Sequence, residues 1–227
     1  MSDITSNNTA VIAKSNGNLL MRCPNLIESG AIAIDAFQTI LQVDLTKYTF
    51  IDFCLLNSDS ERFVWEVEFT FFGITEQWID SHYPSDKFPP WYFQKDTWNP
   101  ETLYGTQYEF EKQSHNGSFA WWPLTGVHDP SDKTEADQAV SPDGWNFSGC
   151  VDYLIKLFQT MKNTAVVFHC MSGADRTGAL HAGYLMRTAG LGVTDAIDKA
   201  TSYVKIGKPN VGYTNLLIAY ENWLKGK

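Results

Sequence analysis

Positive charge is scarce in this sequence. Seventeen Lys and Arg stand against 26 Asp and Glu, so the formal net charge is -9 at pH 7. Proteins that bind nucleic acids or anionic membrane surfaces need clustered Lys and Arg to neutralise phosphates, and no such cluster occurs here. We therefore expect no nucleic-acid partner.

Long apolar runs are also missing. No stretch approaches the roughly 18 consecutive apolar residues that a membrane-spanning helix requires. Residues 1–18 are polar apart from a short AVIA, so they lack the continuous apolar core of a secretory signal. We expect a cytoplasmic protein with no membrane insertion.

Cysteine is sparse, and no cysteine pair has CxxC spacing. The four cysteines are Cys23, Cys54, Cys150 and Cys170. They are too few and too scattered for a disulfide scaffold, and the five histidines form no metal-binding pattern. We predict a reducing compartment, no metal and no cofactor. No repeat of fixed period is present, which excludes solenoid folds.

Apolar segments alternate between strand-like and helix-like patterns. Strands are predicted at 47–56, 118–124 and 164–168. Helices are predicted from Phe147 to Met161, over 177–189 with a stop at Gly190, from a cap at Thr194, and through 216–224. This order predicts an α/β fold whose central, mainly parallel sheet is flanked by helices, in a single domain over 1–227.

The stretch 61–117 fits both a strand and a helix, and we leave the choice open. Its part at about 73–117 is dense in aromatic residues and proline, which indicates an ordered insertion. Trp91, Tyr92 and Trp98 there could line a substrate cleft or form a small core under a long loop.

The segment VVFHCMSGADRTGAL, 166–180, places a Cys and an Arg around five mostly small residues. A strand ends at Phe168 and a helix starts near Arg176, so the amides between them converge at the carboxyl edge of the sheet and can bind an oxyanion. Glycines at 173 and 178 permit close backbone approach. The same amides would lower the pKa of the Cys170 thiol from about 8.5 and make it a nucleophile. A thiolate facing a cradled phosphate indicates a phosphatase.

The motif HCMSGADRTG resembles the signature loop of cysteine-dependent protein tyrosine phosphatases, most closely the bacterial-type tyrosine or dual-specificity enzymes. Upstream, FIDFCLLNSDSE is similar to the strand and following acidic residue of that group. Downstream, HAGYLMRTAGLGVTDAIDKA is similar to its helix, turn and helix. The resemblance covers about 19–60 and 118–226, and it implies a phosphotyrosine protein phosphatase-like fold.

The resemblance also implies a role for each residue of the loop. Cys170 is the expected nucleophile and Arg176 the phosphate clamp. The expected phosphate-binding residues are Met171, Ser172, Gly173, Ala174, Asp175 and Arg176. Thr177 would support the leaving thiolate and His169 would orient the loop. Helix capping and a core histidine are the structural alternatives for these two.

Two carboxyls are candidates for the general acid that protonates the leaving oxygen. Asp175 lies inside the loop, and Asp129 lies in TGVHDPSDKT after the 118–124 strand, with Asp132 as a further candidate. Bracing of a turn is the structural alternative for each. Cys54 could form a protective disulfide with Cys170, as in some members of the superfamily, or be an ordinary core cysteine.

We expect the partner to be a phosphorylated protein or a small phosphate ester. Phosphotyrosine is favoured and dual specificity is open, because Met171 and Ala174 stand where phosphoinositide phosphatases tend to have lysine. A phosphoinositide or inositol phosphate phosphatase and a catalytically silent phosphate-binding module are the alternatives. A rhodanese-type sulfurtransferase fits less well because of the Cys-to-Arg spacing. The sequence gives no oligomeric state.

Overall fold

The computed structural model describes residues 4–28, 31–56, 61, 67–68, 117–142 and 146–226. The predicted aromatic insertion lies outside the described residues up to position 116, and its three named aromatic residues lie there too. Within the stretch that the sequence leaves open between strand and helix, Val67 and Glu68 are helical.

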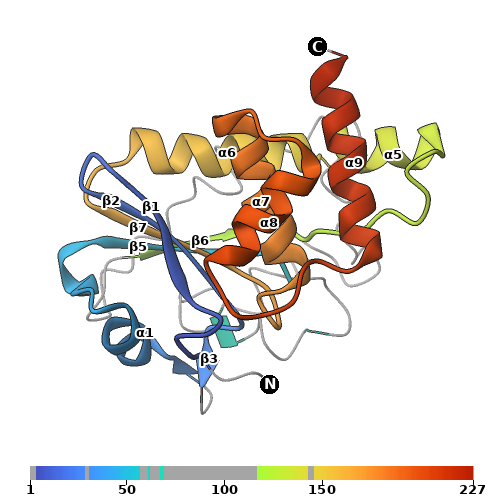
Figure 1. The fold of residues 1–227 in the computed structure, drawn as a ribbon. Coiled ribbons are helices and arrows are strands. Elements are labelled where there is room, and N and C mark those ends of the chain that lie inside the picture. Colours follow the sequence, from blue (N-terminus) through green and yellow to red (C-terminus); the bar gives the residue numbers. More distant parts are fainter. Residues whose placement is uncertain are drawn as a thin grey trace, which may run out of the picture.

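A five-stranded sheet forms the centre of the fold (Figure 1). Its strands, in spatial order, are β1 (Ala10–Ser15), β2 (Asn18–Cys23), β7 (Thr164–His169), β5 (Thr49–Cys54) and β6 (Gly117–Trp121). β1 pairs with β2 antiparallel, and the other three pairings are parallel. A separate small sheet pairs β3 (Ile27–Glu28) with β4 (Ala31–Ile32). The predicted mainly parallel sheet is confirmed.

The hairpin that joins β1 to β2 turns at Asn16 and Gly17, which both have positive φ, of 51° and 78°. Two such residues are typical of the turn that matches the twist of a two-residue hairpin. All six residues of β2 are buried, and β2 pairs in parallel with β7. The sequence prediction did not include β1 and β2.

Helices cover both faces of the sheet. Figure 1 shows α6, α7, α8 and α9 on one side and α1 on the other. The helices are α1 (Ile34–Leu41), α5 (Lys133–Val140), α6 (Phe147–Thr160), α7 (Asp175–Ala189), α8 (Val193–Ser202) and α9 (Val211–Lys225), and a short 3-10 helix spans Leu45–Lys47. None of the helices in the described parts of the chain has both the length and the apolar character needed to cross a bilayer.

The starts of α7 and α8 differ in detail from the sequence prediction. α7 begins at Asp175, two residues before the predicted start, so the arginine of the motif lies in its first turn. Thr194 does not cap α8, because the helix already begins at Val193 after Gly192. The amide of Val193 instead donates to the Glu221 carboxylate of α9 at 3.1 Å. A side chain from a distant helix thus replaces the local cap.

The core lies between the sheet and the helices. β7 is buried along its whole length, as expected for a central parallel strand covered on both faces. The apolar face of α6 packs against the sheet and α7, with Cys150, Val151 and Leu154 fully buried. This layered arrangement confirms the predicted α/β class and leaves the carboxyl ends of β2, β7 and β5 side by side.

Candidate active site

The Cys170 loop leaves the central strand at that shared carboxyl edge. His169 is the last residue of β7, and it pairs in register with Cys23 of β2 on one side and Cys54 of β5 on the other. Cys170 follows directly and is 1% exposed. The amide of Leu55 donates to the carbonyl oxygen of His169 at 2.9 Å, which fixes the point where the loop begins.

Gly173 makes the sharp turn of the loop. Its φ is +77°, a left-handed conformation that side chains disfavour. A Cβ atom there would also lie 3.0 Å from the carbonyl oxygen of Cys23 and from the nitrogen of Pro24. The amide of Asn25 donates to the carbonyl oxygen of Met171 at 3.2 Å. The segment after β2 therefore packs directly against the loop, and only glycine fits at 173.

Arg176 lies in the first turn of α7 and forms a two-pronged ion pair with Glu61. Its Nη1 and Nη2 each lie 2.5 Å from one oxygen of that carboxylate. Nη1 also donates to the carbonyl oxygen of Leu55 at 3.4 Å. Burial alone would lower the pKa of Arg176, but the hydrogen bonds to Glu61 and the charge of Cys170 raise it above its ordinary value. The guanidinium is therefore a fixed cation beside the loop.

Of the three guanidinium nitrogens of Arg176, Nε makes no hydrogen bond with Glu61 or Leu55. This nitrogen is buried and has no hydrogen-bond partner within the described residues. The Thr177 hydroxyl is fully buried and also has no hydrogen-bond partner there. Both atoms are therefore polar groups of this region whose hydrogen-bonding capacity is not used by the described residues.

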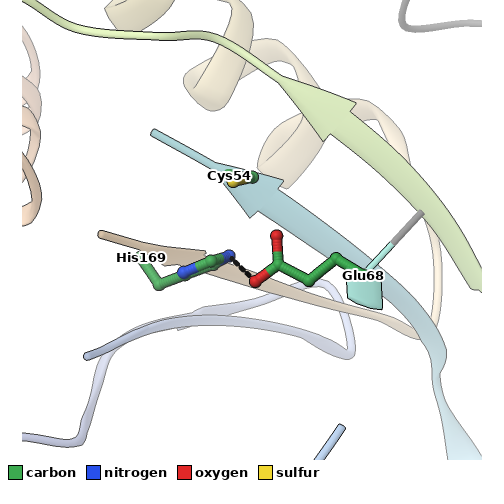
Figure 2. A group of neighbouring side chains, drawn as sticks. All are labelled: Cys54, Glu68 and His169. Carbon is green, nitrogen blue, oxygen red and sulfur yellow. Dashed lines mark ion pairs between the residues drawn. The ribbon is translucent and has the colours of Figure 1, made fainter. Parts of the chain in front are cut away.

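Beneath the loop, His169 contacts two buried carboxylates, those of Asp52 and Glu68. Figure 2 shows its ion pair with Glu68, with Cys54 nearby. Its Nε2 is 2.8 Å from Oδ1 of Asp52 and 3.4 Å from Oε1 of Glu68, and all three side chains are fully buried. Burial lowers the pKa of His169, but the charges of Glu68 and Asp52 outweigh it and raise the pKa to about 9. Burial raises the pKa of Asp52, and it raises that of Glu68 to about 8.

Among the described residues, one group of side chains that overlaps these ion pairs has the composition of a metal site. Cys54, Glu68 and His169 offer ligand atoms that all lie within 4.8 Å of one another. The ion pairs of the histidine already account for the arrangement, and burial raises the pKa of the Cys54 thiol well above its ordinary value, which disfavours the thiolate that a metal needs. The absence of a metal stays a prediction.

A second arginine, Arg22 of β2, reaches the loop from behind. It is 2% exposed, and its Nη2 donates to the carbonyl oxygen of Gly173 at 2.5 Å. Its Nη1 lies 3.1 Å from the carbonyl oxygen of Ala200 and 3.1 Å from Nδ1 of His181. The guanidinium thus joins β2, the loop, α7 and α8.

The general-acid candidates lie in different surroundings. Asp175 is in the first turn of α7, and its carboxylate accepts from the amide of Asn210 at 2.7 Å. Asp129 is exposed, and the side chain and amide of Ser131 donate to it at 2.7 and 2.8 Å, which lowers its pKa. Asp132 is the N-cap of α5 and accepts from the first amides of that helix.

The structure thus gathers some of the predicted site residues and separates others. Cys170 through Thr177 form one loop and helix start, with His169 below the loop. In the described part of the chain, the polar contacts of Asp129 all lie within 129–135. Cys54 is a free, buried cysteine next to Glu68 and His169, and its predicted disulfide with Cys170 stays a hypothesis.

Sequence reasoning assigned no role to four residues of this region: Arg22, Asp52, Glu61 and Glu68. A signal existed for two of them, because a charged residue inside a buried strand is expensive and needs a partner. Arg22 and Asp52 are such residues. Glu61 ends the acidic stretch that resembles the family, but nothing in the sequence indicates that it pairs with Arg176.

Comparison with known proteins finds similarity to phosphatases over part of the sequence. Residues 135–223 match the family described as dual specificity phosphatase, catalytic domain. The resemblance to cysteine-dependent phosphatases is confirmed. Dual specificity protein phosphatase 14 from Homo sapiens and from Bos taurus are each 30% identical over 92 residues, which is 40% of this chain and 46% of each relative. The chain therefore spans just under half the length of the curated relatives it matches.

Among solved structures, the PTP-2 phosphatase of Cydia pomonella is similar over 93% of this chain and 89% of its own, with 16% identity and a TM-score of 0.46.

Proposed function

We propose that this protein is a phosphatase that hydrolyses phosphate monoesters through a phosphocysteine intermediate on Cys170. The observation that carries the proposal is the placement of Cys170 and Arg176 at the two ends of one loop. Between them Gly173 turns the backbone with positive φ, and the loop runs from a buried parallel strand into a helix N-terminus. Such a loop presents amide N–H groups to a tetrahedral anion.

The first step transfers the phosphoryl group to sulfur. The Cys170 thiolate attacks phosphorus, a sulfur–phosphorus bond forms, and the bond from phosphorus to the leaving oxygen breaks. The leaving oxygen takes a proton from the general acid. Arg176 stabilises the equatorial oxygens, and its unpaired Nε is the donor that Glu61 leaves available for them.

The second step returns the free enzyme. Water attacks the phosphocysteine, a phosphorus–oxygen bond forms and the sulfur–phosphorus bond breaks, and the water proton returns to the carboxylate that acted as acid. The Thr177 hydroxyl, which is buried without a partner in the described chain, supports the departing thiolate. His169 holds the loop from below through its pairs with Asp52 and Glu68.

Asp175 is our first choice as general acid and Asp129 our second. Asp175 is next to Arg176 in the loop itself, whereas the Ser131 hydrogen bonds lower the pKa of Asp129 and so favour its carboxylate form. A general acid has to hold a proton at the pH of the reaction. The lowered pKa of Asp129 therefore counts against it, and Asp175 is chosen for its place next to Arg176 in the loop.

We propose a phosphorylated protein of the cytoplasm as substrate, with phosphotyrosine favoured and dual specificity open. The sequence of the loop supports this choice, because Met171 and Ala174 provide no positive charge for additional phosphates. We also propose that the whole chain, 1–227, is one phosphatase domain.

A substrate panel tests the proposal. Phosphotyrosine and phosphoserine peptides, phosphoinositides and inositol phosphates are compared by phosphate release, with para-nitrophenyl phosphate as a general substrate. We expect the highest kcat/KM for phosphotyrosine peptides and no release by Cys170→Ser. Preference for an inositol phosphate would contradict the substrate class. Tight phosphate binding without any turnover would show a silent binding module.

A further inference from the structure

We propose that Arg22 is a positioning residue that fixes the orientation of the Cys170 loop and adds a positive charge behind it. The inference rests on the proposed function for its meaning, since it concerns how the loop binds a phosphate. The role of Arg22 can be tested without turnover, because it concerns the conformation of the loop and its affinity for phosphate.

Arg22 contacts three separate segments of the protein. From the middle of the sheet, where it pairs in register with Phe168, its guanidinium donates to the carbonyl oxygens of Gly173 and Ala200 and lies against Nδ1 of His181. These acceptors belong to the loop, to α8 and to α7. One buried side chain therefore sets the position of the loop relative to both helices that follow it.

The state of His181 agrees with this arrangement. Burial and the neighbouring Arg22 hold the pKa of His181 well below its ordinary value, so the ring is neutral. A neutral imidazole accepts a hydrogen bond at one nitrogen only, and the contact with Arg22 assigns that role to Nδ1. His181 is then an acceptor for the guanidinium, and no charge opposes the arginine there.

The contacts of two loop carbonyls set the direction of the loop amides. In a planar trans peptide, the C=O of one residue and the N–H of the next point in opposite directions. Arg22 holds the carbonyl of Gly173, and the amide of Asn25 holds that of Met171. Both carbonyls are directed toward β2 and the segment after it. The N–H groups of Ser172 and Ala174 therefore point away from β2, as a phosphate cradle requires.

Arg22 also places a positive charge behind the loop. The hydrogen-bond acceptors of Arg22 are two carbonyl oxygens and a neutral ring, so none of them neutralises it. Burial lowers the pKa of Arg22 to about 10, which leaves it cationic at neutral pH, and the charge of Cys170 acts in the opposite sense. A buried cation behind the loop favours negative charge in the loop, whether on the sulfur or on a bound phosphate.

Two variants separate the two roles. Arg22→Met removes both the charge and the donors. Arg22→Lys keeps the charge but replaces the planar fork, whose two terminal nitrogens contact different acceptors, by a single ammonium nitrogen. Arg187→Met is the matched control, because Arg187 pairs at the surface with Asp152. Each protein is first checked for cooperative unfolding. The measurements are the affinity for inorganic phosphate and the pH profile of Cys170 alkylation by iodoacetamide, followed by mass spectrometry.

For Arg22→Met we expect phosphate affinity at least about tenfold weaker, the loss expected when a charge-assisted contact behind the loop is removed, and alkylation that begins at higher pH. For Arg22→Lys we expect weaker phosphate binding with a nearly unchanged alkylation profile. The Arg187→Met control should match the wild type in both. If Arg22→Met does not fold, the lysine variant carries the test.

The inference is overturned if a folded Arg22→Lys protein binds phosphate as the wild type does, or if a folded Arg22→Met protein keeps both wild-type properties. A wild-type protein that shows no turnover, but whose phosphate affinity depends on Arg22, would overturn the proposed function and leave this inference standing. A protein that turns over substrate without any dependence on Arg22 would do the reverse.

Discussion

Arg176 has its two terminal amino groups paired with Glu61, while its Nε stays buried without an acceptor in the described chain. A long side chain in an open site would sample many rotamers, and binding would have to order it. The Glu61 carboxylate performs this ordering in advance, so under the proposed function Nε is already in place for a phosphate oxygen. This residue pair is the feature of the site that the motif alone does not reveal.

Replacing Glu61 by Gln tests this function of the pair. The amide keeps the size of the side chain but removes the charge and one of the two accepting oxygens, so Arg176 loses its fixed orientation. We expect kcat/KM for an aryl phosphate to fall by about 10- to 100-fold, the range expected when a catalytic group is displaced. Asp152→Asn is the control, because its pair with Arg187 is on the surface. Equal activity of wild type and Glu61→Gln would refute this function.

Gly173 and Gly190 form a matched pair for testing the turn of the loop. Both have positive φ, of 77° and 66°, but a Cβ on Gly173 would meet backbone atoms at 3.0 Å, whereas one on Gly190 would meet nothing within 4 Å. Gly190→Ala should cost about 1 kcal/mol from the conformation alone. Gly173→Ala should cost ~2 kcal/mol more from the close contact, and it should abolish phosphate binding. Urea denaturation and a phosphate titration measure both, and equal losses in the two variants would contradict the packing argument.

The elements of the fold explain why the site residues come from separate segments. β2, β7 and β5 run parallel, so their carboxyl ends meet at one edge of the sheet. Each strand brings a charged or titratable side chain to this region: Arg22, His169 and Asp52. α7 then starts at the same edge and supplies Arg176. The sheet assembles the support of the loop, and the helix supplies the proposed phosphate clamp.

Two elements compete for the role of proton donor, and their variants should differ. Asp175→Asn in α7 should remove the basic limb of the pH–rate profile and slow the cleavage of poor leaving groups by about 10²- to 10⁴-fold. Asp129→Asn, between β6 and α5, should leave that limb in place. Substrates with good leaving groups should be hydrolysed almost normally by both variants. A profile that loses its basic limb only in Asp129→Asn would reverse the assignment.

Local patterns predicted the elements that carry the loop, and distant contacts account for the rest. The apolar run before His169 gave the end of β7 to within one residue, and Gly190 gave the end of α7 correctly. The hairpin at Asn16 and Gly17 was missed although its turn residues are typical. Thr194 was predicted as a cap by its type, but Glu221 from α9 supplies the contact.

The candidate site was predictable to the extent that it is local. Cys170, Arg176 and the glycine between them follow from one contiguous motif. The supports of the motif do not, because Glu61 is 115 residues from Arg176 and Arg22 is 151 residues from Gly173. Buried charge in a strand shows that a partner exists, but only the fold identifies which partner it is.

The stability of the whole molecule should fall as pH rises from about 6.5 to about 9. The pKa of His169 is raised from 6.5 to about 9 and that of Glu68 from 4.5 to about 8, and that of Asp52 is raised too. The folded state therefore holds more protons than the unfolded state in this window, and it loses stability as they dissociate. His181 has the opposite sign, since its pKa is lowered, but it acts below pH 6.5.

Urea denaturation across this pH range measures the effect. Glu68→Gln should flatten the slope between pH 6.5 and 8, because the amide does not titrate. Glu221→Gln is the control. The pKa of Glu221 is lowered, so the stability that it contributes changes with pH only below about 4.5 and is constant across this range. A free energy of unfolding that stays constant or rises from pH 6.5 to 9 would show that the buried cluster is not charged as described.

The central claim is that the sulfur of Cys170 receives the phosphoryl group. Acid quenching of the protein during turnover of an aryl phosphate, followed by peptide mass spectrometry, tests this directly. We predict one phosphoryl group on the peptide that contains Cys170, and none in the Cys170→Ser protein. A phosphoryl group on another residue, or phosphate release by Cys170→Ser at the wild-type rate, would contradict the account.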